Sequence, residues 1–141
     1  MTDQAVPFYH APIMAGEVLS LLEPSRGGVF VDGTLGGGGH AQRVLEALPA
    51  GGHLYGIDRD WEAIRAASLR LAPFGERFTA LHGNFFEMKA LLQAEGVTRV
   101  NGILLDLGVS WITRSGAFPI SRRRRWICVW IKVLPFLPVK W

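Results

Sequence analysis

Residues 28–40 read Gly-Val-Phe-Val-Asp-Gly-Thr-Leu-Gly-Gly-Gly-Gly-His. The apolar, partly β-branched run over residues 28–32 predicts a short buried strand that ends in an acid followed by a glycine. Four consecutive glycines come soon after, and residues 40–48 have the apolar spacing of a helix. Glycines let the backbone approach a ligand closely, and the free N–H groups at the start of a helix can face a polar or anionic group. This stretch therefore predicts a ligand-binding loop between a strand and a helix.

Short apolar runs and helical patterns alternate along the first hundred residues. The expected strands are residues 28–32, 53–58, 77–81 and 100–105. The expected helices are residues 13–22, 40–48, 60–71 and 86–94. Strands that are apolar throughout and alternate with helices are typical of a parallel sheet covered on both faces. We therefore predict an α/β, Rossmann-like domain whose ligand lies at the carboxyl ends of the strands.

Three of the expected strands end at an acid, namely Asp32, Asp58 and Asp106. Asp58 comes about 20 residues beyond the glycine loop, where an acid can accept the two hydroxyls of a ribose. Together the loop and this acid predict a cofactor that contains a nucleoside; the alternative is a tight turn beside a solvated acid. Asp106 follows an almost wholly apolar strand, so we expect its carboxylate to be paired or functional.

Two cofactors fit such a site. Gly36, Gly38 and Ala41 match the spacing of the dinucleotide fingerprint, so an NAD-dependent enzyme is one alternative. The fingerprint loop normally begins directly at the strand end, whereas here the residues from Asp32 to Leu35 come first. An acid there repels a pyrophosphate but attracts the ammonium and sulfonium groups of S-adenosylmethionine. We therefore favour S-adenosylmethionine, with Asp32 and Gly36 as supporting candidates for its site.

The net charge of +3 comes from one end of the chain. Residues 1–110 carry eight Lys and Arg against twelve Asp and Glu, a net charge of −4, whereas residues 111–141 carry seven basic residues and no acid. The charge of the first segment therefore gives no sign of a nucleic-acid surface. A single cysteine excludes a disulfide scaffold and a Cys-rich zinc site, and we expect no metal. Neither a signal peptide nor an apolar run of about 20 residues is visible, which predicts a cytoplasmic protein without a membrane partner.

Five segments carry a family resemblance, at residues 10–19, 31–40, 56–60, 82–85 and 101–110. The most specific are the Asp-Gly-Thr entry to the glycine loop, its Gly-Gly-His exit, and Leu-Leu-Asp-Leu-Gly-Val-Ser at residues 104–110. In this order and spacing they closely resemble the ribosomal RNA small subunit methyltransferase H family. The resemblance covers roughly residues 6–110.

The resemblance implies an S-adenosylmethionine-dependent enzyme that methylates the N4 amine of a cytidine in the decoding region of the 16S rRNA of the small ribosomal subunit. The cofactor contacts that it implies are Gly38, Gly39, His40, Asp58, Phe85 and Asp106. Without the family, Phe85 is by default a core aromatic and His40 a polar residue at a helix start. Asp106 is the candidate near the methyl-transfer site. Many amino-methyltransferases have Asn/Asp-Pro-Pro-aromatic here, and this chain does not, so no residue is assigned to the target amine.

The resemblance stops after Ser110, where a tail with four arginines in a row and four of the five tryptophans begins. Codons can be chosen for residues 114–120 so that reading two bases later gives the family motif Glu-Arg-Gly-Phe-Ser-Tyr. The same offset turns residues 124–131 into Pro-Leu-Asp-Met-Arg-Met-Asp, a second family motif, although Trp126, Cys128 and Trp130 leave little codon freedom. We therefore expect a cofactor-binding domain at residues 1–110 and a frameshifted, aberrant tail at residues 111–141.

The family sheet needs later strands, and its RNA contacts need an inserted helical region. Because the tail resembles neither, we expect an incomplete parallel sheet whose strand at residues 100–105 forms an open edge. A further alternative is therefore a non-catalytic fragment or pseudogene product.

Overall fold

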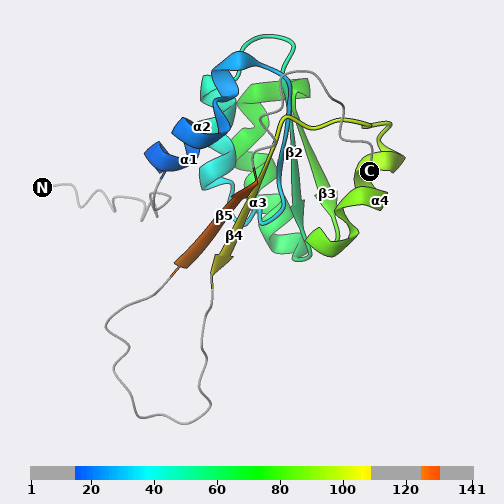
Figure 1. The fold of residues 1–141 in the computed structure, drawn as a ribbon. Coiled ribbons are helices and arrows are strands. Elements are labelled where there is room, and N and C mark those ends of the chain that lie inside the picture. The colour runs from blue at the N-terminus through cyan, green and yellow to red at the C-terminus, as the bar shows by residue number, and fades with distance from the viewer. Residues whose placement is uncertain (1–14, 109–124, 131–141) are drawn as a thin grey trace, which may run out of the picture.

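A computed structural model describes residues 15–108 and 125–130 of the chain. Nine helices and strands follow one another along these residues: α1 (Ala15–Leu22), β1 (Val29–Asp32), α2 (Gly39–Ala47), β2 (His53–Asp58), α3 (Trp61–Leu71), β3 (Phe78–His82), α4 (Met88–Ala94), β4 (Gly102–Gly108) and β5 (Arg125–Trp130). Short 3₁₀ turns lie between them at Pro24–Arg26, Ala72–Arg77 and Phe85–Glu87. The alternation of strands and helices predicted from the sequence is therefore present (Figure 1).

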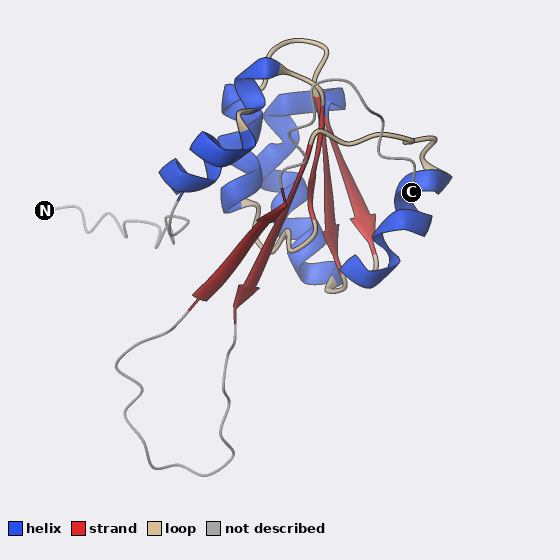
Figure 2. Cartoon of the chain, in the orientation of Figure 1, coloured by secondary structure: helices blue, strands red, loops and turns tan. Residues whose placement is uncertain are grey.

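The strands form one sheet in the order β3-β2-β1-β4-β5 (Figure 2). The first four run parallel, so their carboxyl ends share one edge of the sheet. In the register, Asp32 at the end of β1 lies beside Gly56 of β2 and Leu104 of β4. The predicted α/β, Rossmann-like fold with parallel strands is confirmed.

Helices pack on both faces of the sheet. One apolar cluster contains Phe30 of β1 and the buried faces of α1, α2 and α3. The next residue of β1, Val31, belongs to a second cluster with Met88 and Leu92 of α4. This alternation follows from the two-residue period of a strand. Because both faces are covered, the strands are apolar throughout, which explains the pattern seen in the sequence.

Element boundaries differ from the predicted ones by a few residues. The predicted helix at residues 86–94 begins instead as the 3₁₀ turn Phe85–Glu87 and becomes α-helical at Met88. Asn84 causes this start, because its side chain accepts the N–H of Phe86 while Glu87 accepts the N–H of Asn84, as in a capping box. Residues 13–14 of the first predicted helix lie outside the described residues.

The predicted open edge at the fourth strand is wrong. Strand β5 pairs antiparallel with β4, and Asp106 lies opposite Ile127 in the register. The tail segment Arg-Trp-Ile-Cys-Val-Trp is rich in β-branched and aromatic residues, which favour extended structure. Backbone pairing of an edge requires only an extended neighbour, so it does not depend on the tail having the sequence of the family. The partner also explains why β4 continues to Gly108, beyond the predicted end at residue 105.

Candidate functional site

A pocket of about 310 Å³ opens at the carboxyl ends of the parallel strands. Residues from all four of these strand ends surround it: Gly33, Thr34, Asp58, Arg59, Gly83, Asn84, Phe85, Phe86 and Asp106. Its place agrees with the rule that ligands of open α/β sheets lie beyond the carboxyl ends of the strands. Its size falls in the range of small-molecule sites.

Asp32 lies beneath the pocket and organises the chain where β1 ends. The residue is 2% exposed, and its Oδ1 accepts the N–H of Thr34 at 3.0 Å and the hydroxyl of Thr34 at 3.4 Å. Burial raises the pKa of Asp32 to about 7; the hydrogen bond from the Thr34 N–H opposes this rise, and the charge of Asp106 adds to it. Asp32 does not line the pocket, and its contacts are those of a residue that shapes the loop.

The glycine loop is held by Asp58. The N–H of Gly36 donates to Asp58 Oδ2 at 2.8 Å, and the N–H of Asp60 donates to Asp58 Oδ1 at 2.9 Å. One carboxylate thus joins the loop after β1 to the turn before α3. Because each carboxylate oxygen has a second lone pair, both retain the capacity to accept a further hydrogen bond from a ligand.

Gly38 shows why the loop needs glycine. Its φ is +85°, and it is the residue before the first turn of α2. A Cβ at this position would lie 3.3 Å from Cβ of Ala67 on α3. The left-handed backbone and the close packing of α2 on α3 therefore both disfavour a side chain at this position.

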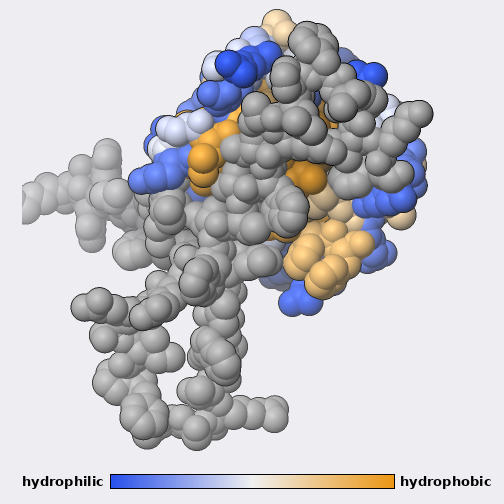
Figure 3. All heavy atoms as spheres, viewed as in Figure 1, coloured by the Kyte–Doolittle hydropathy of each residue, from blue (hydrophilic) through white to orange (hydrophobic). Residues whose placement is uncertain are grey.

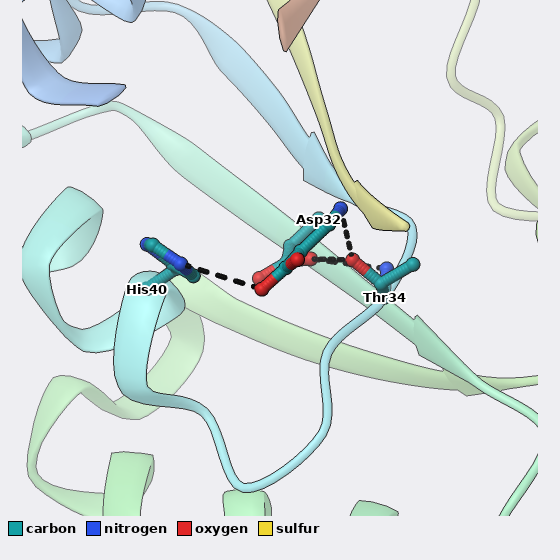
Figure 4. A network of polar contacts seen from close by, with 4 residues as sticks. Asp32, Thr34 and His40 are labelled. Carbon is teal, nitrogen blue, oxygen red and sulfur yellow. Dashed lines mark hydrogen bonds and ion pairs between the residues drawn. The ribbon is translucent and has the colours of Figure 1, made fainter. Parts of the chain in front are cut away.

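His40 and Asp106 come together beside the loop (Figure 4). The Nε2 of His40, in the first turn of α2, lies 3.7 Å from Oδ2 of Asp106, and the two side chains are only 10% and 9% exposed. The backbone N–H of Asp106 donates to the hydroxyl of Thr34 at 2.7 Å. A continuous network thus runs from Asp32 through Thr34 and Asp106 to His40.

Aromatic side chains form the other side of the pocket. Phe85 lines it, and its ring lies 4.4 Å from that of Phe86, which is 84% exposed. Nearby, Trp61 stacks on His82 with ring centroids 3.9 Å apart. An apolar patch is visible over the end of β3 and the start of α4 (Figure 3). Phe85 is therefore a partly buried ring at the pocket wall and also packs against the core cluster of α4.

The predicted site residues occupy several places. Asp58, Phe85 and Asp106 line the pocket. His40 contacts Asp106, and Gly36 bonds to Asp58. Gly38 and Gly39 form the start of α2, and Asp32 lies below. The sequence reasoning assigned no role to six lining residues: Gly33, Thr34, Arg59, Gly83, Asn84 and Phe86. All six follow directly on a strand end or lie within two residues of a predicted site residue. This position in the sequence is the signal by which they could be predicted to line the pocket.

Residues 7–117 match the family model described as the MraW methylase family. The chain belongs to this family. The match begins and ends close to the limits of the predicted resemblance, and it includes all nine lining residues named above.

Relatives of the chain are named ribosomal RNA small subunit methyltransferase H. The protein from Geobacter sulfurreducens is 55% identical over 103 residues, and that from Geotalea uraniireducens is 50% identical over the same length. Each alignment covers 73% of this chain and 33% of the relative. The chain thus spans about one third of the length of the relatives that it matches.

Solved structures share the fold at low sequence identity. A putative rRNA-methylase from Clostridium thermocellum superimposes with a TM-score of 0.53 at 16% identity, covering 63% of this chain and 46% of that one. The O-methyltransferase TomG from Streptomyces achromogenes, in complex with SAM, gives a TM-score of 0.57 at 15% identity, covering 67% and 55%. The Rossmann-like methyltransferase fold is therefore established, and family membership decides against the NAD-dependent alternative.

Two further features of residues 15–108 and 125–130 bear on function. Among them, no helix has the length and apolar character needed to cross a membrane. The same residues contain no group of three or more His, Cys, Asp or Glu side chains placed to hold a metal ion.

Proposed function

We propose that this chain is the cofactor-binding part of an rRNA methyltransferase that modifies the N4 amine of a cytidine in the decoding region of 16S rRNA. The single observation that carries the proposal is the pocket at the strand ends, where the glycine loop, Asp58, Phe85 and Asp106 meet. The family and the names of the relatives support an rRNA substrate. The small ribosomal subunit is then the partner, and the cytoplasm the place of action.

S-adenosylmethionine is the cofactor, and the residues of the pocket fit it. Asp58 offers carboxylate oxygens to ribose hydroxyls, and Phe85 offers an apolar wall to a base. Asp106 supplies negative charge to a cationic ligand. Among the lining residues that the structure describes, the charged side chains are Asp58, Asp106 and Arg59. Carboxylates outnumber cations in this set, as suits a ligand with cationic groups and no phosphate.

In the proposed mechanism the cofactor supplies a methyl group on a sulfonium, which is electrophilic without further activation. The chain's own residues bind the cofactor and orient it. Asp58 fixes the glycine loop through Gly36, so the loop is in place before a ligand arrives. Gly38, Gly39 and His40 begin α2 beside Asp106. We propose Asp106 as the residue nearest the methyl-transfer site, because it lines the pocket and its carboxylate can accept a hydrogen bond from an amine.

Calorimetric titration of the 141-residue chain with S-adenosylmethionine and with NAD tests cofactor choice. We expect heat of binding with the first and none with the second. Binding of NAD alone would overturn the proposal. Transfer of a labelled methyl group to small ribosomal subunits, followed by nucleoside analysis, tests the reaction, and N4-methylcytidine is the expected product.

A second candidate function is a cofactor-binding fragment that does not transfer the methyl group. It is favoured by one observation, namely that the chain spans 33% of the length of its relatives. Binding of S-adenosylmethionine without any methyl transfer to the small subunit would select this candidate.

We further propose that residues 111–141 are read from a shifted frame. The motifs recovered two bases later at residues 114–120 and 124–131 support this proposal. Sequencing of the gene tests it, and we expect the shifted frame beyond codon 110 to continue as a methyltransferase. A shifted frame that encodes no methyltransferase sequence would refute it.

A further inference from the structure

Thr34 occupies the point where the ladder between β1 and β4 ends. The last main-chain bond on this side runs from the N–H of Gly33 to the carbonyl of Leu104, at 2.9 Å. Two residues further along β4, the N–H of Asp106 donates to the hydroxyl of Thr34 at 2.7 Å instead of to a main-chain carbonyl. A side chain therefore takes over the role of the strand backbone where β1 turns away into the glycine loop.

The hydroxyl of Thr34 is itself held in place. It donates to Asp32 Oδ1 at 3.4 Å, and Asp32 Oδ1 also accepts the main-chain N–H of Thr34 at 3.0 Å. Asp32 is almost fully buried, so this anchor is rigid. The main-chain N–H of Asp106 is thus held, through Thr34, by a residue of the neighbouring strand.

The position of Asp106 affects ligand binding because Asp106 lies at the pocket. It lines the pocket, and its side chain is 9% exposed, so its charge is only weakly screened by water. The attraction between a carboxylate and a cation depends on their separation. S-adenosylmethionine carries a positive charge on sulfur, and the product of methyl transfer, S-adenosylhomocysteine, does not. A displacement of Asp106 therefore changes the binding of these two ligands unequally.

We propose that Thr34 is a positioning residue that sets how strongly the pocket prefers S-adenosylmethionine to S-adenosylhomocysteine, because its hydroxyl fixes the place of Asp106. The proposal rests on the proposed function of the pocket as a site for this cofactor. It assigns Thr34 a part in cofactor discrimination and product release.

Three variants of the full 141-residue chain test the proposal by calorimetry with both ligands. Thr34→Val removes the hydroxyl at nearly constant volume, and Thr34→Ser keeps it. Thr79→Val is the matched control, because Thr79 on β3 also forms a hydroxyl hydrogen bond, to His53 Nε2 at 2.8 Å, but does not line the pocket. Melting temperatures of all variants report stability separately from ligand preference.

In Thr34→Val we expect the affinity for S-adenosylmethionine to fall about tenfold and that for S-adenosylhomocysteine to fall by less than about threefold. Thr34→Ser should keep the wild-type ratio of the two affinities. Thr79→Val should melt at a lower temperature with an unchanged ratio. A residue with a merely structural role would weaken both ligands equally, so the ratio is the decisive measurement.

Equal weakening of both ligands in Thr34→Val overturns the proposal, as does a changed ratio in Thr34→Ser or in Thr79→Val. If circular dichroism shows that Thr34→Val does not fold, Thr34→Ala gives the same comparison. If the wild-type chain binds both ligands and the ratio of affinities is unchanged in Thr34→Val, this inference is refuted and the proposed function stands. Wild-type chain that binds neither ligand refutes the proposed function as well.

Discussion

The N–H of Gly36 donates to Oδ2 of Asp58 at 2.8 Å, so the acid expected to bind a ribose also holds the glycine loop. The two roles are compatible because a carboxylate oxygen can accept two hydrogen bonds. The acid and the loop are parts of one preformed unit, although they come from different strands.

Asp58→Asn is therefore expected to weaken S-adenosylmethionine binding by at least about tenfold. The substitution replaces a charged carboxylate by a neutral amide with a single acceptor oxygen, which leaves either the loop N–H or a ribose hydroxyl poorly bonded. Calorimetric titration measures the change. Glu62→Gln is the control, because Glu62 is an acid in the adjacent first turn of α3 and does not line the pocket. Equal effects of the two substitutions would contradict a specific role for Asp58.

The buried Asp32 predicts a pH dependence of stability. Its pKa is raised from 3.8 to about 7 in the folded chain. The folded state therefore holds a proton on Asp32 that the unfolded state releases at a lower pH. The stabilising contribution of the protonated form is complete below about pH 4 and is lost as the pH rises to about 7, with a total change of up to about 4 kcal/mol.

Urea unfolding of the wild type and Asp32→Asn at pH 5 and pH 8 measures this effect. Asparagine does not titrate, so the variant does not lose this contribution as the pH rises. The free energy of unfolding of the variant minus that of the wild type should therefore be larger at pH 8 than at pH 5. Other acids titrate in both proteins and cancel in the comparison. The same difference at both pH values would show that Asp32 has an ordinary pKa.

Gly38→Ala is expected to destabilise the chain by about 1–3 kcal/mol, because alanine would adopt a left-handed backbone and crowd Ala67. Gly37→Ala is its control, since no atom lies within 4 Å of a Cβ built there and its φ is not positive. Thermal unfolding followed by circular dichroism compares the two. A similar loss of stability in both variants would mean that the close approach of α2 to α3 is not the cause.

Strand β5 is expected to protect the edge of β4. A chain ending at residue 110 should aggregate faster than the full chain, because it exposes the unpaired backbone of a long apolar strand. A chain ending at residue 130 retains β5 and is the control. Light scattering at matched concentration measures the rates, and equal rates for the two shortened chains would show that β5 does not protect the edge.

The sequence predicted the fold of residues 15–108 well because buried parallel strands and amphipathic helices have different periods and lengths. Phe30 and Val31 show the limit of this reasoning. Both were predicted to be buried, but the faces of the sheet on which they pack depend on long-range pairing that no local pattern contains. Strand β5 is not predicted for a related reason. The tail departs from the family resemblance, and its β-branched and aromatic residues alone do not show which edge they pair with.

The candidate site was predictable at positions where a residue type has few structural roles. Acids at the ends of apolar strands are unusual, so the sequence makes Asp58 and Asp106 candidates, and both line the pocket. Thr34 is not such a candidate, because a threonine beside a glycine loop has many ordinary roles. Its importance depends on a hydrogen bond to a residue 72 positions away. Such pairings depend on the order of the strands in the sheet.

The strand order has a consequence for synthesis on the ribosome. With β1 between β2 and β4, the ends of the four parallel strands lie together, and the lining residues that the structure describes all come from the segment from Gly33 to Asp106. The ribosome has therefore translated all of these residues before it reaches the codons at which the family resemblance ends. A change in reading frame downstream of codon 110 alters none of these described residues.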